Sequence, residues 1–276
     1  MKTIKSKTIV FITGAFVSHH GWSNWQSFFE KNNYTCFSPP WKYKDATPEV
    51  LRKIDPYDND LKHLRLSELN DYFEKFIKTL PEKPIIIGHS TGGLIVQVLL
   101  QRGVAAAGIA IHSVPPLGVL SFQPSFLKSL WGPLGLFSTV DKTFLMSFKQ
   151  WQYSFTNGMT HDQQRKAYNQ NVVPESKRLI RDCLSSAAKV NFKKPHPPLL
   201  FISGSTDHIM PASLNYSNYK KYKKNGSITE YKEFEGKNHF VLGLPSWKDE
   251  AAFALDWINE HSHDEKKSDS HLVRNR

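Results

Sequence analysis

Residues 84–102 read PIIIGHSTGGLIVQVLLQR, and this stretch decides the fold. It begins with an apolar, β-branched run, and from Thr91 onward leucine, isoleucine and valine recur at helical spacing. Between the two lies Gly88-His89-Ser90-Thr91-Gly92-Gly93. A serine at the apex of a sharp strand-to-helix turn has a strained backbone, and glycines two residues to either side relieve the clashes. The stretch therefore predicts that Ser90 projects above the edge of a sheet.

The same alternation of apolar runs and helical patterns continues along the chain. It is typical of βαβ units around a parallel sheet flanked by helices. The predicted strands are residues 8–13, 34–38, 84–88, 108–113, 199–203 and 227–234. The predicted core helices include residues 22–29, 66–80, 91–102 and 246–260. We therefore expect an α/β fold.

The alternation breaks once, between residues 114 and 192. Pro115-Pro116 opens a stretch that is rich in aromatic residues but has no convincing core strand. We expect an inserted helical cap, with an amphipathic helix over residues 174–190. Its rings can form the core of the cap or the wall of an apolar pocket. The predicted organisation is a core of residues 1–113 and 193–262, the cap at 114–192 and a flexible tail at 263–276.

Composition excludes several classes of protein. The chain has 276 residues, 39% of them hydrophobic, and a formal net charge of +11. A mean hydropathy of -0.45 and the absence of a long apolar run argue against a membrane-spanning helix. The lysines are scattered, so we expect no nucleic-acid partner and no membrane partner. Two cysteines far apart suggest no disulfide framework, and the apolar N-terminal run is too short for a signal peptide, so we expect a cytoplasmic protein.

A serine hydroxyl becomes a good nucleophile only when a base takes its proton and an acid orients that base. Asp207 follows the predicted strand at 199–203, and His239 follows the one at 227–234. Both therefore lie on loops at the carboxyl ends of strands. Other acidic candidates lie in the insertion or in the final helix: Asp141, Asp162, Asp182 and Asp256. The sequence thus predicts a catalytic set of Ser90, Asp207 and His239.

The elbow and the order serine, acid, histidine resemble the α/β-hydrolase superfamily, and the resemblance covers residues 8–260. It implies an α/β-hydrolase fold, with a mostly parallel sheet and a helical cap inserted after the strand that follows the elbow helix. The insertion found here begins at that position. The resemblance also implies that Ser90 is the nucleophile and His239 the general base and then acid. Asp207 would fix the imidazole tautomer and stabilise its charged form.

The resemblance further implies two backbone donors for an oxyanion. One is Thr91, which opens the helix after the elbow, where the helix dipole is positive. In the family the other donor comes from a loop that usually opens with His-Gly, whereas this chain has Thr13-Gly14-Ala15-Phe16. The missing histidine weakens the motif, but only a backbone amide is needed. Ala15 is the expected donor, with Phe16 as the alternative in a shifted register.

Other residues are expected to bind the substrate: Phe16, His19, His89, His112, Trp131, Phe144 and Trp151. None of the histidines forms a metal signature such as the helical His-Glu-x-x-His of zinc peptidases. We therefore predict no metal and no organic cofactor.

Such a site predicts hydrolysis of a carboxylic ester or lactone, and the aromatic cap favours a bulky apolar substrate. The chain looks similar to small bacterial esterases, lactonases and cofactor-free haloperoxidase-like proteins. It is also similar to serine-dependent macrolide esterases, which open the lactone ring of macrolide antibiotics and so confer resistance. The best specific interpretation is a macrolide esterase. Alternatives are a general carboxylesterase or acyl-lactone hydrolase, a proline-iminopeptidase-like peptidase and a ligand-sensing receptor of the same fold. The oligomeric state is open, with a monomer favoured.

Overall fold

The computed structural model describes residues 4–135, 137–222 and 226–262. Six parallel strands form its main sheet, in the order β2-β1-β3-β4-β7-β8. They are β1 (Thr8–Ile12), β2 (Thr35–Phe37), β3 (Ile85–His89), β4 (Ala107–Ile111), β7 (Leu199–Gly204) and β8 (Thr229–Phe234). All six correspond to strands predicted from the sequence, with ends shifted by one or two residues. The α/β prediction is therefore confirmed.

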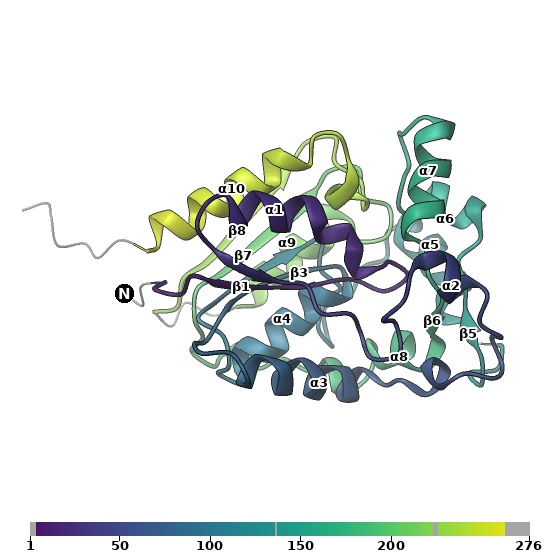
Figure 1. Ribbon diagram of the computed structural model, residues 1–276, viewed down its shortest axis with the longest axis horizontal. Helices are drawn as coiled ribbons and strands as arrows, with labels where there is room; N and C mark the ends of the chain where they lie inside the picture. Colours follow the sequence, from purple (N-terminus) through teal and green to yellow (C-terminus); the bar gives the residue numbers. More distant parts are fainter. Residues whose placement is uncertain (1–3, 136, 223–225, 263–276) are drawn as a thin grey trace, which may run out of the picture.

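Helices cover both faces of the sheet because alternate strand residues point to opposite sides. On one face, Ile9 and Phe11 of β1 share a core with α1 (Ser23–Glu30) and α10 (Trp247–Glu260). On the other face, Val10 and Ile12 share a core with α3 (Leu66–Lys78), α4 (Thr91–Gln101) and α9 (Ala212–Lys221). Figure 1 shows α1 and α10 on one side of the strands, with α3 and α4 on the other.

The connection from β4 to β7 carries a group of smaller elements beyond one end of the sheet (Figure 1). We call residues 114–192 the cap. Its elements are α5 (Pro124–Leu134), β5 (Thr143–Phe144), α6 (Phe148–Ser154), α7 (His161–Asn171), β6 (Glu175–Ser176), α8 (Lys177–Asp182) and the 3₁₀ turn η3 (Ser186–Ala188). The loop between β2 and α3 packs against them with α2 (Pro48–Arg52) and the 3₁₀ turn η2 (Asp60–His63). Two further 3₁₀ turns, η1 (His19–Trp22) and η4 (Val241–Gly243), lie in loops of the core.

The prediction of a single helix over residues 174–190 was wrong. Glu175 and Ser176 instead form β6, which pairs antiparallel with β5. The Ser176 side chain then accepts a hydrogen bond from the Leu179 amide and caps α8, so the helix begins only at Lys177. The tail expected at residues 263–276 lies outside the described residues.

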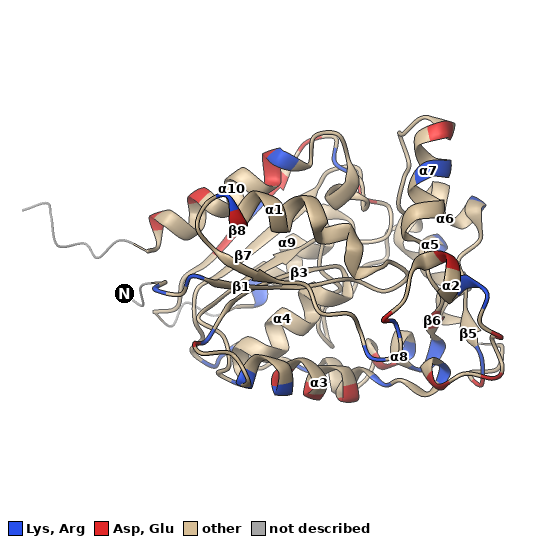
Figure 2. Cartoon of the chain, in the orientation of Figure 1, with Lys and Arg blue, Asp and Glu red and all other residues tan. Residues whose placement is uncertain are grey.

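Charged residues of both signs are spread over α3, α7 and α10 rather than gathered in one place (Figure 2). The absence of a nucleic-acid partner stays a prediction. Within the described ranges, no helix is both long and apolar enough to cross a membrane.

The start of α4 crosses directly over the end of β1, and only glycine fits at the crossing. A Cβ atom built on Gly92 would lie 2.1 Å from the carbonyl oxygen of Ile12. One built on Gly88 would lie 2.2 Å from the carbonyl oxygen of Gly92. In both cases the clash is with a backbone atom, which cannot move away by rotation as a side-chain atom can. The two glycines therefore set how closely the elbow approaches the sheet.

We expect Gly92→Ala to lower the free energy of unfolding by about 3 kcal/mol, the upper end of typical overpacking costs. Gly21→Ala is the matched control, because a Cβ there would meet only the Asn171 side chain, at an ordinary 3.6 Å. Urea unfolding followed by tryptophan fluorescence measures both. Equal midpoints for the two variants would contradict the steric argument.

Candidate active site

Ser90 lies between β3 and α4 in the conformation that the elbow motif predicts. Its backbone angles, φ 57° and ψ -119°, are rare for a residue with a side chain. Hydrogen bonds hold this conformation: the Ser90 amide donates to the Ile111 carbonyl at 3.0 Å, and the Ser90 carbonyl accepts from the Gly93 and Val114 amides at 2.9 and 3.0 Å. No residue of the described ranges hydrogen-bonds the Ser90 hydroxyl, which borders the main cavity. The hydroxyl is therefore available to a substrate.

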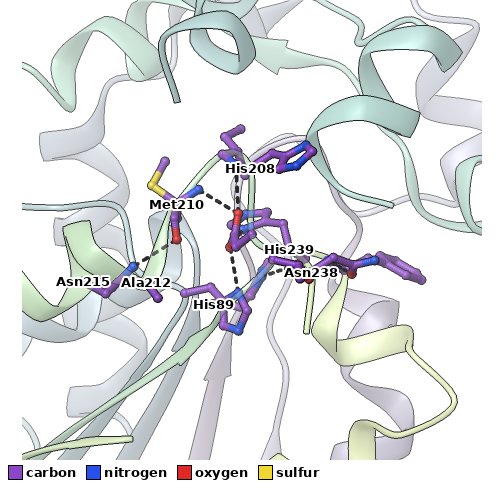
Figure 3. Close-up of polar contacts among 12 residues, drawn as sticks. His89, His208, Met210, Ala212, Asn215, Asn238 and His239 are labelled. Carbon is purple, nitrogen blue, oxygen red and sulfur yellow. Dashed lines mark hydrogen bonds and ion pairs between the residues drawn. The ribbon is translucent and has the colours of Figure 1, made fainter. Parts of the chain in front are cut away.

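Asp207 and His239 form a buried pair on neighbouring loops after β7 and β8. The Oδ2 atom of Asp207 lies 2.6 Å from Nδ1 of His239, and both side chains are fully buried. The Oδ1 atom accepts the amides of Ile209 and Met210 at 2.9 and 2.8 Å. Figure 3 shows Met210, His89 and His239 converging on this network from three segments. The carboxylate thus fixes the ring of His239.

The other ring nitrogen of His239, Nε2, is buried and has no hydrogen-bond partner among the described residues. The hydrogen bond from Ser90 to this nitrogen is not formed in the structure. The two loops are nevertheless tied together, because Nε2 of His89, the residue before Ser90, lies 2.9 Å from the His239 carbonyl. The predicted acid and base are already paired, and the predicted mechanism needs only the serine to join them. Such bonds often tighten only when substrate binds.

His112 is a second imidazole on the same carboxylate. Its Nδ1 lies 2.7 Å from Oδ2 of Asp207, and its ring is fully buried. Its φ of 46° is unusual for a non-glycine residue, and Gly204 leaves room for the ring, since a Cβ there would lie 2.6 Å from Cε1 of His112. The sequence predicts that His112 binds substrate; the structure instead places its ring against the Asp207 carboxylate, and His112 is not among the described residues that line the main cavity. The sequence could have indicated this contact, because His112 follows β4, and β4 is the neighbour of β7, the strand that leads to Asp207.

Burial sets the charge state of these groups. It lowers the pKa of His239 from 6.5, although the neighbouring Asp207 acts in the opposite direction. Burial, followed by His239 and His112, holds the pKa of His89 well below its usual value. Burial alone would raise the pKa of Asp207, but together His239 and His112 outweigh it and keep this pKa well below its usual range. At neutral pH the site therefore has an ionised acid and a neutral base.

The residue types of this cluster also suit a metal ion. Ligand atoms of His112, Asp207 and His239 all lie within 4.8 Å of one another. Each Nδ1, however, is 2.6 or 2.7 Å from Oδ2, which is hydrogen-bond length. Ligands of one tetrahedral zinc, each bonded at about 2.0–2.1 Å, stand about 3.3–3.5 Å apart. The geometry favours a hydrogen-bonded triad, and the absence of a metal stays a prediction.

The loop after β1 supplies the second expected oxyanion donor. It lies against the elbow, because a Cβ on Gly14 would be 2.6 Å from Cβ of Ser90. Ala15 and Thr91 both border the cavity beside Ser90. The alternative donor, Phe16, has its amide directed to Oε2 of Glu175 at 3.3 Å. This favours Ala15, with Thr91, as the pair of donors. Glu175 is a residue of the site that the sequence did not indicate.

The main cavity has a volume of about 830 Å³, and Ser90, Ala15 and Thr91 lie at its edge. The rest of its wall is mostly apolar and comes largely from the cap, including Leu117, Leu120, Phe126, Leu130, Trp131 and Leu184. A smaller hollow of about 30 Å³ touches His239 and shares Phe155 with the main cavity. The large space is therefore on the cap side of Ser90.

The predicted substrate contacts differ in their distance from this cavity. Phe16 and Trp131 line it, and Trp131 is 72% exposed. Phe144 packs edge-on against Phe16, with 5.9 Å between ring centroids. Trp151 is fully buried and stacks on Phe155, which does line the cavity. Phe144 and Trp151 thus support the wall from behind.

His19 and His89 lie outside the main cavity. His19 is part of η1, and its ring packs against that of His20 with centroids 4.1 Å apart. His89 lines the small hollow beneath His239. Contact of either with substrate remains a prediction.

A fluorophosphonate probe tests the predicted nucleophile and base together. We expect one adduct, on Ser90, in the wild-type protein and none in Ser90→Ala with an unchanged circular dichroism spectrum. Only neutral His239 can accept the serine proton, so labelling slows when pH falls below its pKa. Because that pKa is lowered, the midpoint of the acid limb should lie below pH 6.5. Mass spectrometry of labelling time courses measures both results; an adduct on Ser90→Ala would refute the assignment.

His112→Asn tests the second imidazole. Asparagine tolerates a positive φ, and its side-chain amide nitrogen stands where Nδ1 of histidine does, so it can keep the hydrogen bond to Asp207 while the imidazole ring is removed. His112 lowers the pKa of His239, so its removal should raise that pKa and shift the acid limb of labelling to higher pH. His20→Asn, an exposed histidine outside the cluster, is the control. An unchanged midpoint in His112→Asn would show that His112 does not influence the base.

Comparisons with known proteins agree with the fold. A search of curated proteins finds no match. Among solved structures, a monoacylglycerol lipase from Paleococcus ferrophilus is similar, with 17% identity, a TM-score of 0.65 and coverage of 92% of this chain and 95% of that one. A methylesterase from Arabidopsis has 16% identity, a TM-score of 0.63 and coverage of 92% and 99%. A variant of tomato Methylketone Synthase I has 14% identity and a TM-score of 0.67, with coverage of 93% of this chain and 98% of that one. At this identity, the structures show the fold alone.

The family comparison adds membership to the shared fold. The sequence model of the alpha/beta hydrolase family matches residues 9–254, which include the elbow and both loops of the Asp207–His239 pair. The chain therefore belongs to the alpha/beta hydrolase family.

Proposed function

We propose that the protein hydrolyses a carboxylic ester or lactone of a large apolar substrate through an acyl-enzyme on Ser90, and that a macrolactone is this substrate. The size and the apolar wall of the main cavity are the observations that support this proposal. Its volume of about 830 Å³ is in the upper part of the range of about 300–1,000 Å³ for small-molecule sites. Its wall is mostly apolar, so a short ester would leave most of it unfilled.

The reaction follows from the positions of the polar groups. The Ser90 hydroxyl attacks the ester carbonyl while Nε2 of His239 takes its proton. The Ala15 and Thr91 amides stabilise the oxyanion, and Asp207 stabilises the imidazolium. His239 then gives the proton to the alkoxide, which breaks the ester bond and leaves an acyl-enzyme. Water, deprotonated by His239, attacks the acyl group; the carboxylic acid is released and the serine regains its proton.

A cyclic ester suits a site with one large space. A linear ester with two bulky halves needs room on both sides of the serine, whereas the hollow beside His239 measures only about 30 Å³. In a macrolactone the acyl and alkoxy halves are joined in one ring, so both can occupy the cap-side cavity. Ring opening then gives a single product with one added water.

The apolar wall also favours a second candidate, a long-chain ester with a small alcohol. One similar structure is a monoacylglycerol lipase. The aminopeptidase alternative gains no support, because none of the described residues that line the cavity is an aspartate or glutamate to bind a substrate amine. A ligand-sensing receptor of this fold would retain the cavity and fail to turn over.

The test is a substrate panel with wild-type protein and Ser90→Ala. It contains large-ring macrolides, acyl lactones, glycerol monoesters and nitrophenyl esters of increasing chain length. We expect the wild-type protein alone to add one water to a macrolide, detected by mass spectrometry. Cleavage restricted to long-chain linear esters would replace the macrolactone by the second candidate. Binding without turnover of any compound would favour the receptor.

The wall itself is tested by Trp131→Ala, which removes a ring that lines the cavity. We expect the KM for the large substrate to rise several-fold while cleavage of a short nitrophenyl ester stays the same. Tyr216→Ala is the control, because Tyr216 is also partly exposed but lies outside the cavity.

A further inference from the structure

Glu175 is a charged residue buried beside the expected oxyanion site. It lies in β6 of the cap, and its side chain is fully buried. Oε2 accepts the Lys44 ammonium at 2.7 Å and the Phe16 amide at 3.3 Å, and Oε1 accepts the Ser176 amide at 3.0 Å. Lys44 is itself buried and lies over the ring of Trp41. An ion pair this deep is costly unless its hydrogen bonds are satisfied.

The same part of the cap holds the whole loop from residue 16 to residue 18. The Phe16 carbonyl accepts the Val173 amide at 2.9 Å, and the Ser18 amide donates to the Asn171 carbonyl at 3.0 Å. Val17 and Val172 form an antiparallel bridge between these two bonds. The hydrogen bond from the Phe16 amide to the Glu175 carboxylate is the one closest to Ala15. The φ of Phe16, 68°, is held by contacts on both sides of its peptide unit.

We propose that Glu175 and Lys44 are positioning residues for the oxyanion hole. By accepting the Phe16 amide, the carboxylate fixes the peptide plane between Ala15 and Phe16. This restrains Ala15, which lines the Ser90 cavity and carries the expected donor on its preceding peptide. Lys44 also neutralises the charge of this carboxylate. A bare carboxylate here would oppose the negative charge that develops on the substrate oxygen, and the ammonium at 2.7 Å neutralises it. The inference rests on the proposed acyl transfer.

The chain provides its own control in Asp182. This carboxylate of the cap is also buried, binds Arg65 through Nε and Nη2 at 2.7 and 2.6 Å, and accepts the Leu66 amide at 3.1 Å. It therefore joins cap to core with the same kinds of bond as Glu175, but at the start of α3 rather than beside Ser90. The partners differ in exposure, since the Arg65 side chain is 52% exposed and that of Lys44 only 3%. A purely structural role predicts that both variants lose stability without a selective loss of activity.

The experiment compares Glu175→Gln with Asp182→Asn. Three quantities are measured: kcat and KM on a nitrophenyl ester, affinity for a trifluoromethyl ketone, and the urea midpoint. The ketone forms an oxyanion adduct with the serine, so it reports on the oxyanion hole. We expect Glu175→Gln to lower kcat about 10- to 100-fold with little change in KM, as for a misplaced oxyanion donor, and to weaken ketone binding by a similar factor. Asp182→Asn should keep both values within about twofold while lowering the urea midpoint.

Lys44→Met tests the charge. It should lower kcat, and Lys44→Met/Glu175→Gln should recover part of the loss because no uncompensated carboxylate is left. Should Glu175→Gln fail to fold, Glu175→Asp takes its place: it keeps the charge but is one methylene shorter, and should reduce ketone affinity. Equal kcat and ketone affinity in folded Glu175 and Asp182 variants would overturn the inference. Failure of the wild-type protein to react with the fluorophosphonate or the ketone would instead refute the acyl-transfer mechanism itself.

Discussion

The buried carboxylate of Asp207 is the interaction on which the site depends. It accepts four hydrogen bonds, two from imidazoles and two from amides of its own loop. Its partners come from the ends of β4 and β8, which flank β7 in the sheet. Because all three strands are parallel, their carboxyl ends meet at one edge, and one carboxylate can orient groups from three loops. Sharing Oδ2 between His112 and His239 spreads its charge, which together with burial keeps the base neutral at physiological pH.

The serine is positioned by backbone geometry rather than by side-chain contacts. Gly92 lets the elbow approach β1, Gly88 lets the start of α4 lie close to β3, and Gly14 lets the loop after β1 approach Ser90. The predicted nucleophile and both expected oxyanion donors therefore depend on three close contacts, where an added methyl group has no space. This explains why the strained φ of Ser90 persists: relaxing it would move the serine and the start of α4 together.

Much of the fold was predictable because its signals are local. Four of the six strands, β1, β3, β4 and β7, are mostly apolar runs, and Ser90, Asp207 and His239 each follow a strand that the sequence predicts. The missed features depend on contacts between distant segments. Phe16 and Glu175 are 159 positions apart, and nothing in the local pattern at either residue indicates the other. The prediction of a helix over residues 174–190 was wrong at its start for the same reason, since residues 175 and 176 pair with β5 instead of joining the helix.

The cap therefore lines the candidate active site and also contacts the loop that carries Ala15. Its apolar residues enclose the space for substrate, and its polar residues reach the loop that carries Ala15. Breaking one partner of a buried ion pair such as Lys44–Glu175 costs about 3–5 kcal/mol, a large part of the stability of a typical domain. Movement of the segment that holds residues 16–18 would incur this cost and disturb the oxyanion site at once. We therefore expect substrate to enter at the exposed apolar end near Trp131 rather than beside Glu175, because apolar contacts can exchange without leaving a charge unpaired.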